Sequence, residues 1–130
     1  MDLEGICKDV NRLVKEVGKF IKGEVIKLND KDVQEKGTHD LVTYVDKNSE
    51  FMLVDQLKKI FPDAGFIAEE NPGLLPSDQF NWVIDPLDGT TNFVHSIPVY
   101  SISIALMDKG EVLLGVVYEI NTDELFHTWK

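Results

Sequence analysis

Residues 99–120 read "VYSISIALMDKGEVLLGVVYEI", and the pattern of this stretch decides the fold. From Tyr100 to Leu106, large apolar residues alternate with small or polar ones, which is the period of a strand with two different faces. The "DKG" at 108–110 is typical of a turn, and "EVLLGVVYEI" then returns the chain. A second turn at 121–123 leads into "ELFHTWK", so the spacing predicts an antiparallel meander of three strands.

Upstream of the meander, two short apolar stretches predict buried strands. They are "GFIA" at 65–68 and "NWVI" at 81–84. Closer to the N-terminus, apolar residues recur at three- and four-residue steps from Leu3 to Ile21. This recurrence predicts an amphipathic helix that ends between Gly23 and Leu28.

Between this helix and the first short strand, the sequence predicts a loop, a β-prone stretch and a second helix. Residues 29–40 are polar and rich in turn formers, which indicates a mobile loop, and "DLVTYVD" at 40–46 is short and β-prone. Asp46 then begins a second helix that Pro62 ends. Its apolar side would carry Phe51, Val54, Leu57 and Phe61. We therefore expect an α+β fold, a layered α/β arrangement with two helices packed on a mostly antiparallel sheet.

Composition and charge limit the classes of function. The chain has 130 residues, 43% hydrophobic and 28% charged, as expected of one globular domain that can bury a core. Its formal net charge of −10 makes nucleic acid and anionic membranes unfavourable partners, so we expect neither. A single cysteine, Cys7, excludes an intramolecular disulfide, and we expect it to be buried. No apolar run suits a signal or a membrane span, which favours a cytoplasmic location.

Acidic residues follow the predicted strands at corresponding places. Asp46 lies at a strand-to-helix junction, Glu69 follows "GFIA", and Asp85 and Asp88 follow "NWVI". The ends of neighbouring strands converge on one crevice in layered α/β structures, so these carboxylates are expected to meet. Gathered carboxylates repel one another, and a hard divalent cation such as Mg²⁺, which prefers oxygen ligands, would stabilise them.

The segment "DPLDGT", residues 85–90, has a spacing that suits both metal and phosphate. Pro86 fixes its own φ and disposes Asp85 to an extended backbone, so that both aspartates can face one pocket, with the Leu87 carbonyl as a further oxygen ligand. Gly89 permits close backbone approach, and the next residues, Thr90 and Thr91, would start a helix or tight turn whose N–H groups suit phosphate.

Each of these features also has an ordinary structural interpretation. "DPLDG" at 85–89 is a common turn sequence, Asp46 could serve only as a helix N-cap, and Glu69 and Glu70 could lie in a solvated loop. Taken together these interpretations are less favoured, because independent turns would not be expected to place acids at the ends of successive apolar strands.

Three stretches of the chain resemble the inositol monophosphatase family of Mg²⁺-dependent, lithium-sensitive phosphatases. They are "KGTHDLVTYVD", "GFIAEEN" and "WVIDPLDGTTNFVHSIPVYSISIAL". Related phosphatases share "DPxDGT" but differ after it, so "TNF" at 91–93 with His95 favours the inositol monophosphatase branch. The resemblance extends over essentially the whole chain and implies the N-terminal half of the family's fold.

The resemblance also implies a set of site residues. The implied metal ligands are Glu69, Asp85, the Leu87 carbonyl and Asp88, which would hold two or three Mg²⁺ ions, with Mn²⁺ as a substitute. The implied catalytic residues are Asp46 and Thr90, which activate the attacking water, together with Glu69. The implied phosphate-binding residues are Asp88, Gly89, Thr90 and Thr91. Lys36 would lie on a mobile loop that can approach the site, whereas His39, His95 and His127 are expected to be structural.

The function that follows from the resemblance is Mg²⁺-dependent hydrolysis of inositol monophosphate or a similar small sugar phosphate by a metal-activated water. The alternatives are a fructose-1,6-bisphosphatase, a bisphosphate nucleotidase, or a truncated, noncatalytic module that binds metal and phosphate. Family members have a second α/β half, so residues 1–130 are interpreted as the N-terminal metal-binding α+β domain of a longer protein. The expected partners are a small phosphorylated substrate and, since family members are commonly dimers, a second copy of the chain.

Overall fold

The computed structural model describes the backbone of residues 1–28, 31–68, 71 and 73–130, and the side chains of these residues except 26–43. The described elements are α1 (Leu3–Leu28), α2 (Lys31–Ile60), β1 (Gly65–Ile67), β2 (Phe80–Asp88), α3 (Thr90–Val94), β3 (Ser101–Asp108), β4 (Glu111–Glu119) and β5 (Glu124–Trp129). Within this described part, no helix is both long enough and apolar enough to cross a membrane.

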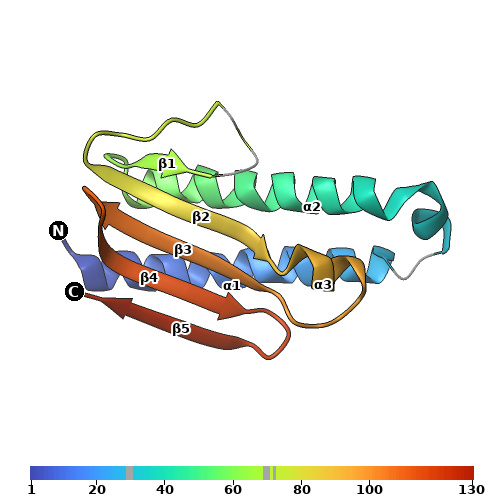
Figure 1. Ribbon diagram of the computed structural model, residues 1–130. Coiled ribbons are helices and arrows are strands. Elements are labelled where there is room, and N and C mark those ends of the chain that lie inside the picture. Colours follow the sequence, from blue (N-terminus) through green and yellow to red (C-terminus); the bar gives the residue numbers. More distant parts are fainter. Residues whose placement is uncertain (29–30, 69–70, 72) are drawn as a thin grey trace.

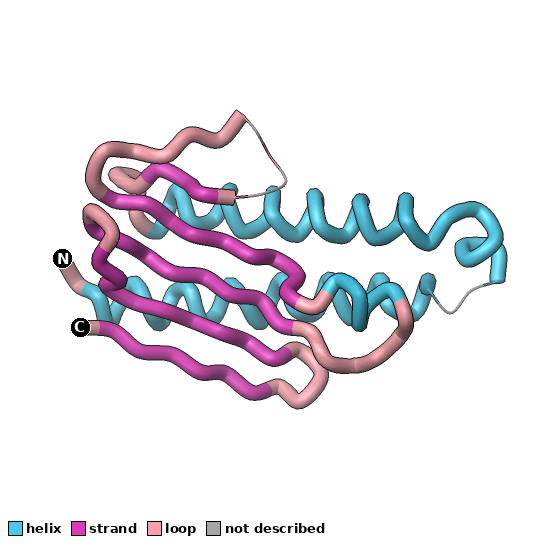
Figure 2. The backbone as a smooth tube through the Cα atoms, viewed as in Figure 1, coloured by secondary structure: helices cyan, strands magenta, loops and turns pink. Residues whose placement is uncertain are grey.

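The strands form one sheet in the order β1-β2-β3-β4-β5. Strand β1 is parallel to β2, and every other neighbouring pair is antiparallel. Helices α1 and α2 lie side by side against one face of this sheet (Figure 1), and no described element covers the opposite face (Figure 2). The arrangement confirms the expected α+β architecture, with two long helices on a mostly antiparallel sheet.

The alternation in the meander places one row of side chains against the helices. Ile104 pairs with Val116, and Leu106 pairs with Leu114, and all four side chains are buried. The stripe of α1 that meets this row consists of Cys7, Val10, Val14, Val17 and Ile21. Each large apolar side chain removed from water in this way contributes about 1.5–3 kcal/mol, so this interface supplies much of the stability.

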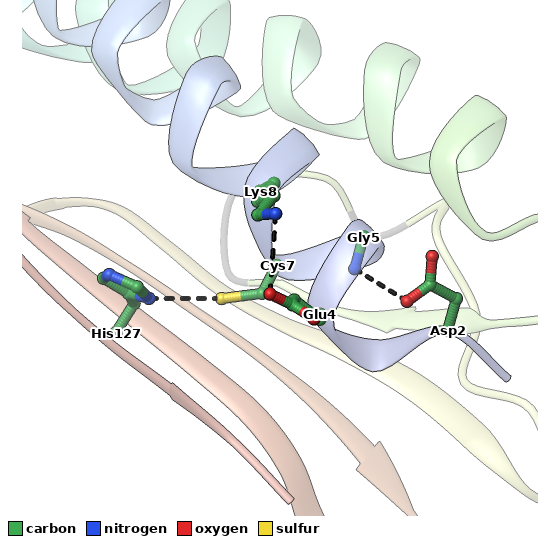
Figure 3. Close-up of polar contacts among 6 residues, drawn as sticks. All are labelled: Asp2, Glu4, Gly5, Cys7, Lys8 and His127. Carbon is green, nitrogen blue, oxygen red and sulfur yellow. Dashed lines mark hydrogen bonds and ion pairs between the residues drawn. The ribbon is translucent and has the colours of Figure 1, made fainter.

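Polar groups fix both the start of α1 and its position beneath β5 (Figure 3). Asp2 is the N-cap, because its Oδ1 accepts a hydrogen bond of 2.9 Å from the backbone N–H of Gly5. One turn later, Cys7 Sγ lies 3.7 Å from Nδ1 of His127 on β5. Cys7 is fully buried, as the sequence predicts, and burial raises the pKa of its thiol.

Two predictions about the chain before β1 are wrong. The expected loop and the β-prone stretch lie within α2 from Lys31 onward, and Asp46 is inside this helix instead of at its start. A strand needs a neighbour for its backbone hydrogen bonds, and no described strand lies beyond β1, whereas a helix satisfies them locally. Residues 29–30 of the expected loop lie outside the described part.

The buried side of α2 also differs from the predicted side. Leu53, Val54 and Leu57 are buried, but Phe51 has an exposed fraction of 68%. Glu50 occupies the buried side instead, with an exposed fraction of only 2%. The apolar spacing predicted the helix but assigned Phe51 to the wrong side, because a carboxylate is not expected in the core.

Candidate functional site

A cavity of about 140 Å³ lies at the end of β2, between this strand and α2. Its lining residues are Asp46, Asp85, Pro86, Leu87, Asp88, Gly89 and Thr90. Asp46 comes from the middle of α2, and the other residues come from the end of β2 and the start of α3. Residues separated by about forty positions in the sequence therefore line one cavity.

An irregularity in the β2–β3 pairing shapes one wall of this cavity. Asp85 pairs with Ser103, and Asp88 pairs with Ser101, so two residues of β2 lie opposite the single residue Ile102 of β3. Those residues are Pro86, which has no N–H to donate to the ladder, and Leu87. Both are buried, while Asp85 is half-buried and Asp88 is exposed. The bulge thus turns the strand end so that both carboxylates line the same cavity.

Gly89 is required at the junction between β2 and α3 for two reasons. Its φ of 107° lies in the left-handed region that favours glycine. A Cβ at this position would also lie 3.0 Å from the Val99 carbonyl oxygen and 3.1 Å from Cβ of Tyr100. The backbone therefore approaches the loop before β3 as closely as a residue without a side chain allows.

Thr90 joins the start of α3 to the bulge. Its Oγ1 donates a hydrogen bond of 3.0 Å to the Leu87 carbonyl oxygen. The hydroxyl has one proton, which this bond uses, so toward any other group it can act only as an acceptor. The Leu87 carbonyl keeps a second lone pair. The two oxygens therefore offer acceptor positions beside the carboxylates of Asp85 and Asp88.

Two residues that position α3 had no assigned role in the sequence analysis. The Asn92 side-chain amide donates to the Val99 carbonyl at 2.7 Å, and the backbone carbonyl of Asn92 accepts from the Ile97 N–H at 2.8 Å. Tyr100 packs edge-on against Phe93, with ring centroids 5.4 Å apart. In the sequence, the position of Asn92 directly after the threonine pair was the one feature that could have indicated its role. Nothing about Tyr100 indicated a role beyond its place in the strand alternation.

Glu119 connects this end of the sheet to the meander. Its Oε1 accepts from the Tyr100 N–H at 3.3 Å, and its Oε2 accepts from both the N–H and the hydroxyl of Thr122. Burial alone would raise the pKa of Glu119, but the hydrogen bonds from Thr122, Asn121 and Tyr100 outweigh it and hold that pKa below its ordinary value. Glu119 is thus an ionised anchor for the strand that supports Gly89.

Some predicted site residues lie apart from the cavity or outside the described part. Thr91 is exposed on α3 and does not line the cavity, and His95 is exposed as well. Glu69 and Glu70 are outside the described residues, as are the side chains of Lys36 and His39. The structure therefore brings together Asp46, Asp85, Leu87, Asp88, Gly89 and Thr90, and it says nothing of Glu69 or of the Lys36 side chain.

The carboxylates, the Leu87 carbonyl and the Thr90 hydroxyl around the cavity would all bind a metal through oxygen atoms. Oxygen atoms are the ligands that Mg²⁺ prefers. The described residues contain no group of three or more His, Cys, Asp or Glu close enough to form a metal site by themselves. Mg²⁺ does not need such a group, because it is usually held by one or two carboxylates together with water and substrate phosphate. Asp85, Asp88 and the Leu87 carbonyl fit that requirement.

A larger hollow of about 730 Å³ lies on the open face of the sheet. Its walls are mostly apolar, including Val83, Val117 and Phe126, and Asp85 stands at its border with the smaller cavity. Asp85 is therefore common to both cavities, whereas residues 86–90 line only the smaller one.

Comparison with known proteins agrees with this geometry. The family model described as the inositol monophosphatase family matches residues 2–130. The chain belongs to the inositol monophosphatase family. The resemblance carried by the acidic segment and the strands around it is thereby confirmed.

Relatives in this family carry two kinds of name. The fructose-1,6-bisphosphatase/inositol-1-monophosphatase of Thermotoga maritima is 48% identical over 82 residues, which are 63% of this chain and 31% of that protein. The Nus factor SuhB of Pasteurella multocida is 41% identical over 116 residues, which are 88% of this chain and 43% of that protein. The family thus includes proteins named for phosphatase activity and proteins named as Nus factors.

The fold also matches a solved structure of the family. The inositol monophosphatase of Anabaena (Nostoc) sp. PCC 7120 superposes with a TM-score of 0.81 at 30% identity, over 99% of this chain and 45% of that chain. The chain therefore spans less than half the length of each of these three members of the inositol monophosphatase family.

Proposed function

We propose that this chain carries the metal- and phosphate-binding part of a phosphatase that hydrolyses inositol monophosphate or a similar small sugar phosphate. The observation that carries the proposal is the cavity at the end of β2, where Asp46, Asp85 and Asp88 line one space with Thr90. Membership of the inositol monophosphatase family supports the reaction class. The Thermotoga relative, whose name includes both fructose-1,6-bisphosphate and inositol 1-phosphate as substrates, supports the substrate class.

The residues that would hold divalent metal are Asp85, Asp88 and the Leu87 carbonyl, with Glu69 as a further ligand. Bound Mg²⁺ would offset the charge of the phosphate and lower the pKa of a coordinated water. Without a cation, the half-buried Asp85 carboxylate and its acidic neighbours would oppose the approach of an anionic substrate. The acidic lining is therefore consistent with a site that takes cation and phosphate together.

The described side chains suggest how the attacking water is oriented and where its proton goes. The Thr90 hydroxyl donates its hydrogen bond to the Leu87 carbonyl, so its Oγ1 can accept a hydrogen bond from a water in the cavity. Asp46 lines the cavity from α2, on the other side from the bulge, and its carboxylate would take the proton of that water. Phosphate oxygens would be received by the backbone N–H group of Gly89, which lines the cavity.

Asp88→Asn tests this proposal, since it removes a charge and changes little volume. We expect Mg²⁺- or Mn²⁺-dependent phosphate release from inositol 1-phosphate to fall at least about 100-fold, because replacing even groups that support a metal ligand costs about 10–100-fold. Asp108→Asn is the matched control, because Asp108 ends β3 and pairs with Glu111, outside the cavity. Calorimetric titration with Mn²⁺ would measure metal binding in the same two variants.

The outcomes separate catalysis from binding alone. Unchanged turnover in Asp88→Asn would reject the proposed site. If the chain binds Mn²⁺ through Asp88 but releases no phosphate from inositol 1-phosphate or fructose 1,6-bisphosphate, the noncatalytic alternative replaces phosphatase activity for this chain. The relative named as a Nus factor makes this second outcome a specific alternative.

A further inference from the structure

The peptide group between Val99 and Tyr100 lies directly against Gly89, at the turn from β2 into α3. A Cβ on Gly89 would be 3.0 Å from the Val99 carbonyl oxygen and 3.2 Å from Cα of Tyr100. Backbone therefore meets backbone here, and close-packed atoms transmit a displacement instead of absorbing it. Because Gly89 lines the cavity at the end of β2, the position of the Val99–Tyr100 peptide decides where this part of the cavity wall lies.

Two side chains bind this peptide group, one at each end. The side-chain amide of Asn92, on α3, donates a hydrogen bond of 2.7 Å to the Val99 carbonyl. At the other end, Oε1 of Glu119, on β4, accepts a hydrogen bond of 3.3 Å from the Tyr100 N–H. The Val99 carbonyl and the Tyr100 N–H belong to one planar unit, so the two bonds fix its orientation as well as its place.

Both side chains that bind the peptide start from fixed positions. The other carboxylate oxygen of Glu119, Oε2, accepts hydrogen bonds of 2.7 Å from the N–H of Thr122 and of 2.6 Å from its hydroxyl. The backbone carbonyl of Asn92 accepts a hydrogen bond of 2.8 Å from the Ile97 N–H. The turn after α3 is therefore closed through the backbone of Asn92 as well as through its side chain.

The short helix α3 depends on this neighbourhood for its position. It has five residues, and its N-cap, Gly89, makes no side-chain capping bond. An isolated helix of this length is not stable in water, so tertiary contacts must hold it. Among them are the Asn92 hydrogen bond and the edge-on packing of Phe93, which is 1% exposed, against the Tyr100 ring. These contacts therefore also place Thr90, the first residue of α3, at the cavity.

We propose that Asn92 and Glu119 are positioning residues of the site at the end of β2, acting through the Val99–Tyr100 peptide on Gly89. This inference rests on the proposed function, because the group that they position is the Gly89 N–H that would receive phosphate. Neither residue lines the cavity, so each acts through the peptide and not on the substrate. Asp85 and Asp88 precede Gly89 and are paired with β3, so phosphate binding should depend on this arrangement more than metal binding does.

Titration with inorganic phosphate in the presence of Mg²⁺, followed by NMR of the backbone amides, tests the proposal. Asn92→Ala removes the donor to the Val99 carbonyl, and Glu119→Ala removes the acceptor for the Tyr100 N–H. For each variant we expect about tenfold weaker phosphate binding, the size of effect of one hydrogen bond. The Gly89 amide resonance should also move in both variants before any ligand is added. Mn²⁺ affinity, measured by calorimetry without phosphate, should stay close to that of the parent chain.

Two control variants separate positioning from a general loss of structure. Asn11→Ala removes an asparagine from α1, away from the cavity, and should change neither phosphate affinity nor the Gly89 resonance. Glu119→Gln keeps one acceptor oxygen for the Tyr100 N–H, so most of the phosphate affinity lost in Glu119→Ala should return. Circular dichroism establishes that each variant is folded. Asn92→Leu, which has similar size and no donor, replaces Asn92→Ala if that variant does not fold.

A double variant tests whether Asn92 acts through the peptide that touches Gly89. A methyl group in Gly89→Ala presses on the Val99 carbonyl, and Asn92→Ala frees that carbonyl to move away. We therefore expect the double variant to bind phosphate about tenfold more weakly than the parent chain, whereas independent effects would multiply to about a hundredfold. A hundredfold loss would contradict the proposed route.

The outcomes distinguish this inference from the proposed function. If the parent chain binds phosphate and both alanine variants bind it equally well, Asn92 and Glu119 are not positioning residues, and the proposed function stands. An unmoved Gly89 resonance in both folded variants overturns the inference in the same way. If the parent chain binds Mn²⁺ but no phosphate, the proposed function fails and the phosphate role of the two residues fails with it. In that case a moved Gly89 resonance would still show that they position Gly89.

Discussion

The meander β3–β5 and the junction between β2 and α3 belong to the same sheet, yet they depend on different kinds of residue. In the meander, pairs such as Ile104–Val116 and Leu106–Leu114 repeat one pattern, so that each position resembles its neighbours. In the junction, each residue has a different structural role. Pro86 lies in the bulge, Gly89 allows the close approach of the backbone, and Thr90 hydrogen-bonds the Leu87 carbonyl. Substitutions in the meander should therefore change stability, whereas substitutions in the junction should change the site.

The largest expected effect is in the meander. Leu106→Ala removes a fully buried side chain, and we expect it to lower the free energy of unfolding by about 2–5 kcal/mol. Urea denaturation measures this loss, and Leu75→Ala, at a position with an exposed fraction of 75%, is the control. At temperatures where Leu106→Ala is folded, Mn²⁺ affinity should equal that of the parent chain. A large loss of affinity in the folded variant would contradict the separation of the two regions.

The second effect compares two glycines with the same backbone handedness. Gly89 and Gly110 both have positive φ, but a Cβ on Gly110 would meet no atom within 4 Å, whereas one on Gly89 would press on Val99 and Tyr100. We expect Gly110→Ala to cost about 1 kcal/mol and Gly89→Ala about 2–3 kcal/mol, since steric strain is added to the backbone term. Denaturation and Mn²⁺ titration of both variants measure stability and binding. Equal Mn²⁺ affinities would show that the junction tolerates a side chain.

The smallest effect concerns the residue that joins the two regions. The hydrogen-bonded Glu119 has a lowered pKa in the folded chain, so the stability it contributes is present above its ordinary pKa of 4.5 and is lost as the pH falls through the folded value. We expect Glu119→Gln to remove less than about 1 kcal/mol of stability at neutral pH, and to flatten the loss below pH 4.5. Denaturation curves at several pH values test this, with Glu16→Gln on the exposed side of α1 as the control. An equally steep acid loss in Glu119→Gln would assign the dependence to other groups.

The sequence was sufficient to predict the regular part of the fold. Alternation from Tyr100 to Leu106 predicted β3, and the apolar spacing from Leu3 to Ile21 predicted α1, because burial on one side imposes a period that the residues themselves display. Residues before Asp46 were misassigned, since β-branched and aromatic residues favour a strand only where a neighbouring strand exists to pair with it. That neighbour is a property of the whole fold and cannot be read from a local stretch.

The site was predictable to a different extent. The acids at the ends of apolar stretches were sufficient to expect Asp46, Asp85 and Asp88 on one cavity, although Asp46 reaches that cavity from within a helix. The support given by Asn92 and Tyr100 was not predictable, because it depends on how the loop before β3 returns past Gly89. The metal and phosphate roles of the lining residues, and the part played by Glu69, stay predictions.

Cys7 gives the chain a built-in chemical reporter. It is the only cysteine, it is fully buried, and it lies beneath the edge strand through its contact with His127. A thiol reagent in the solvent can reach its sulfur only when the packing between α1 and β5 opens. The rate at which the chain is labelled therefore measures how often this packing opens, by detachment of the last strand or by global unfolding, without introducing a probe.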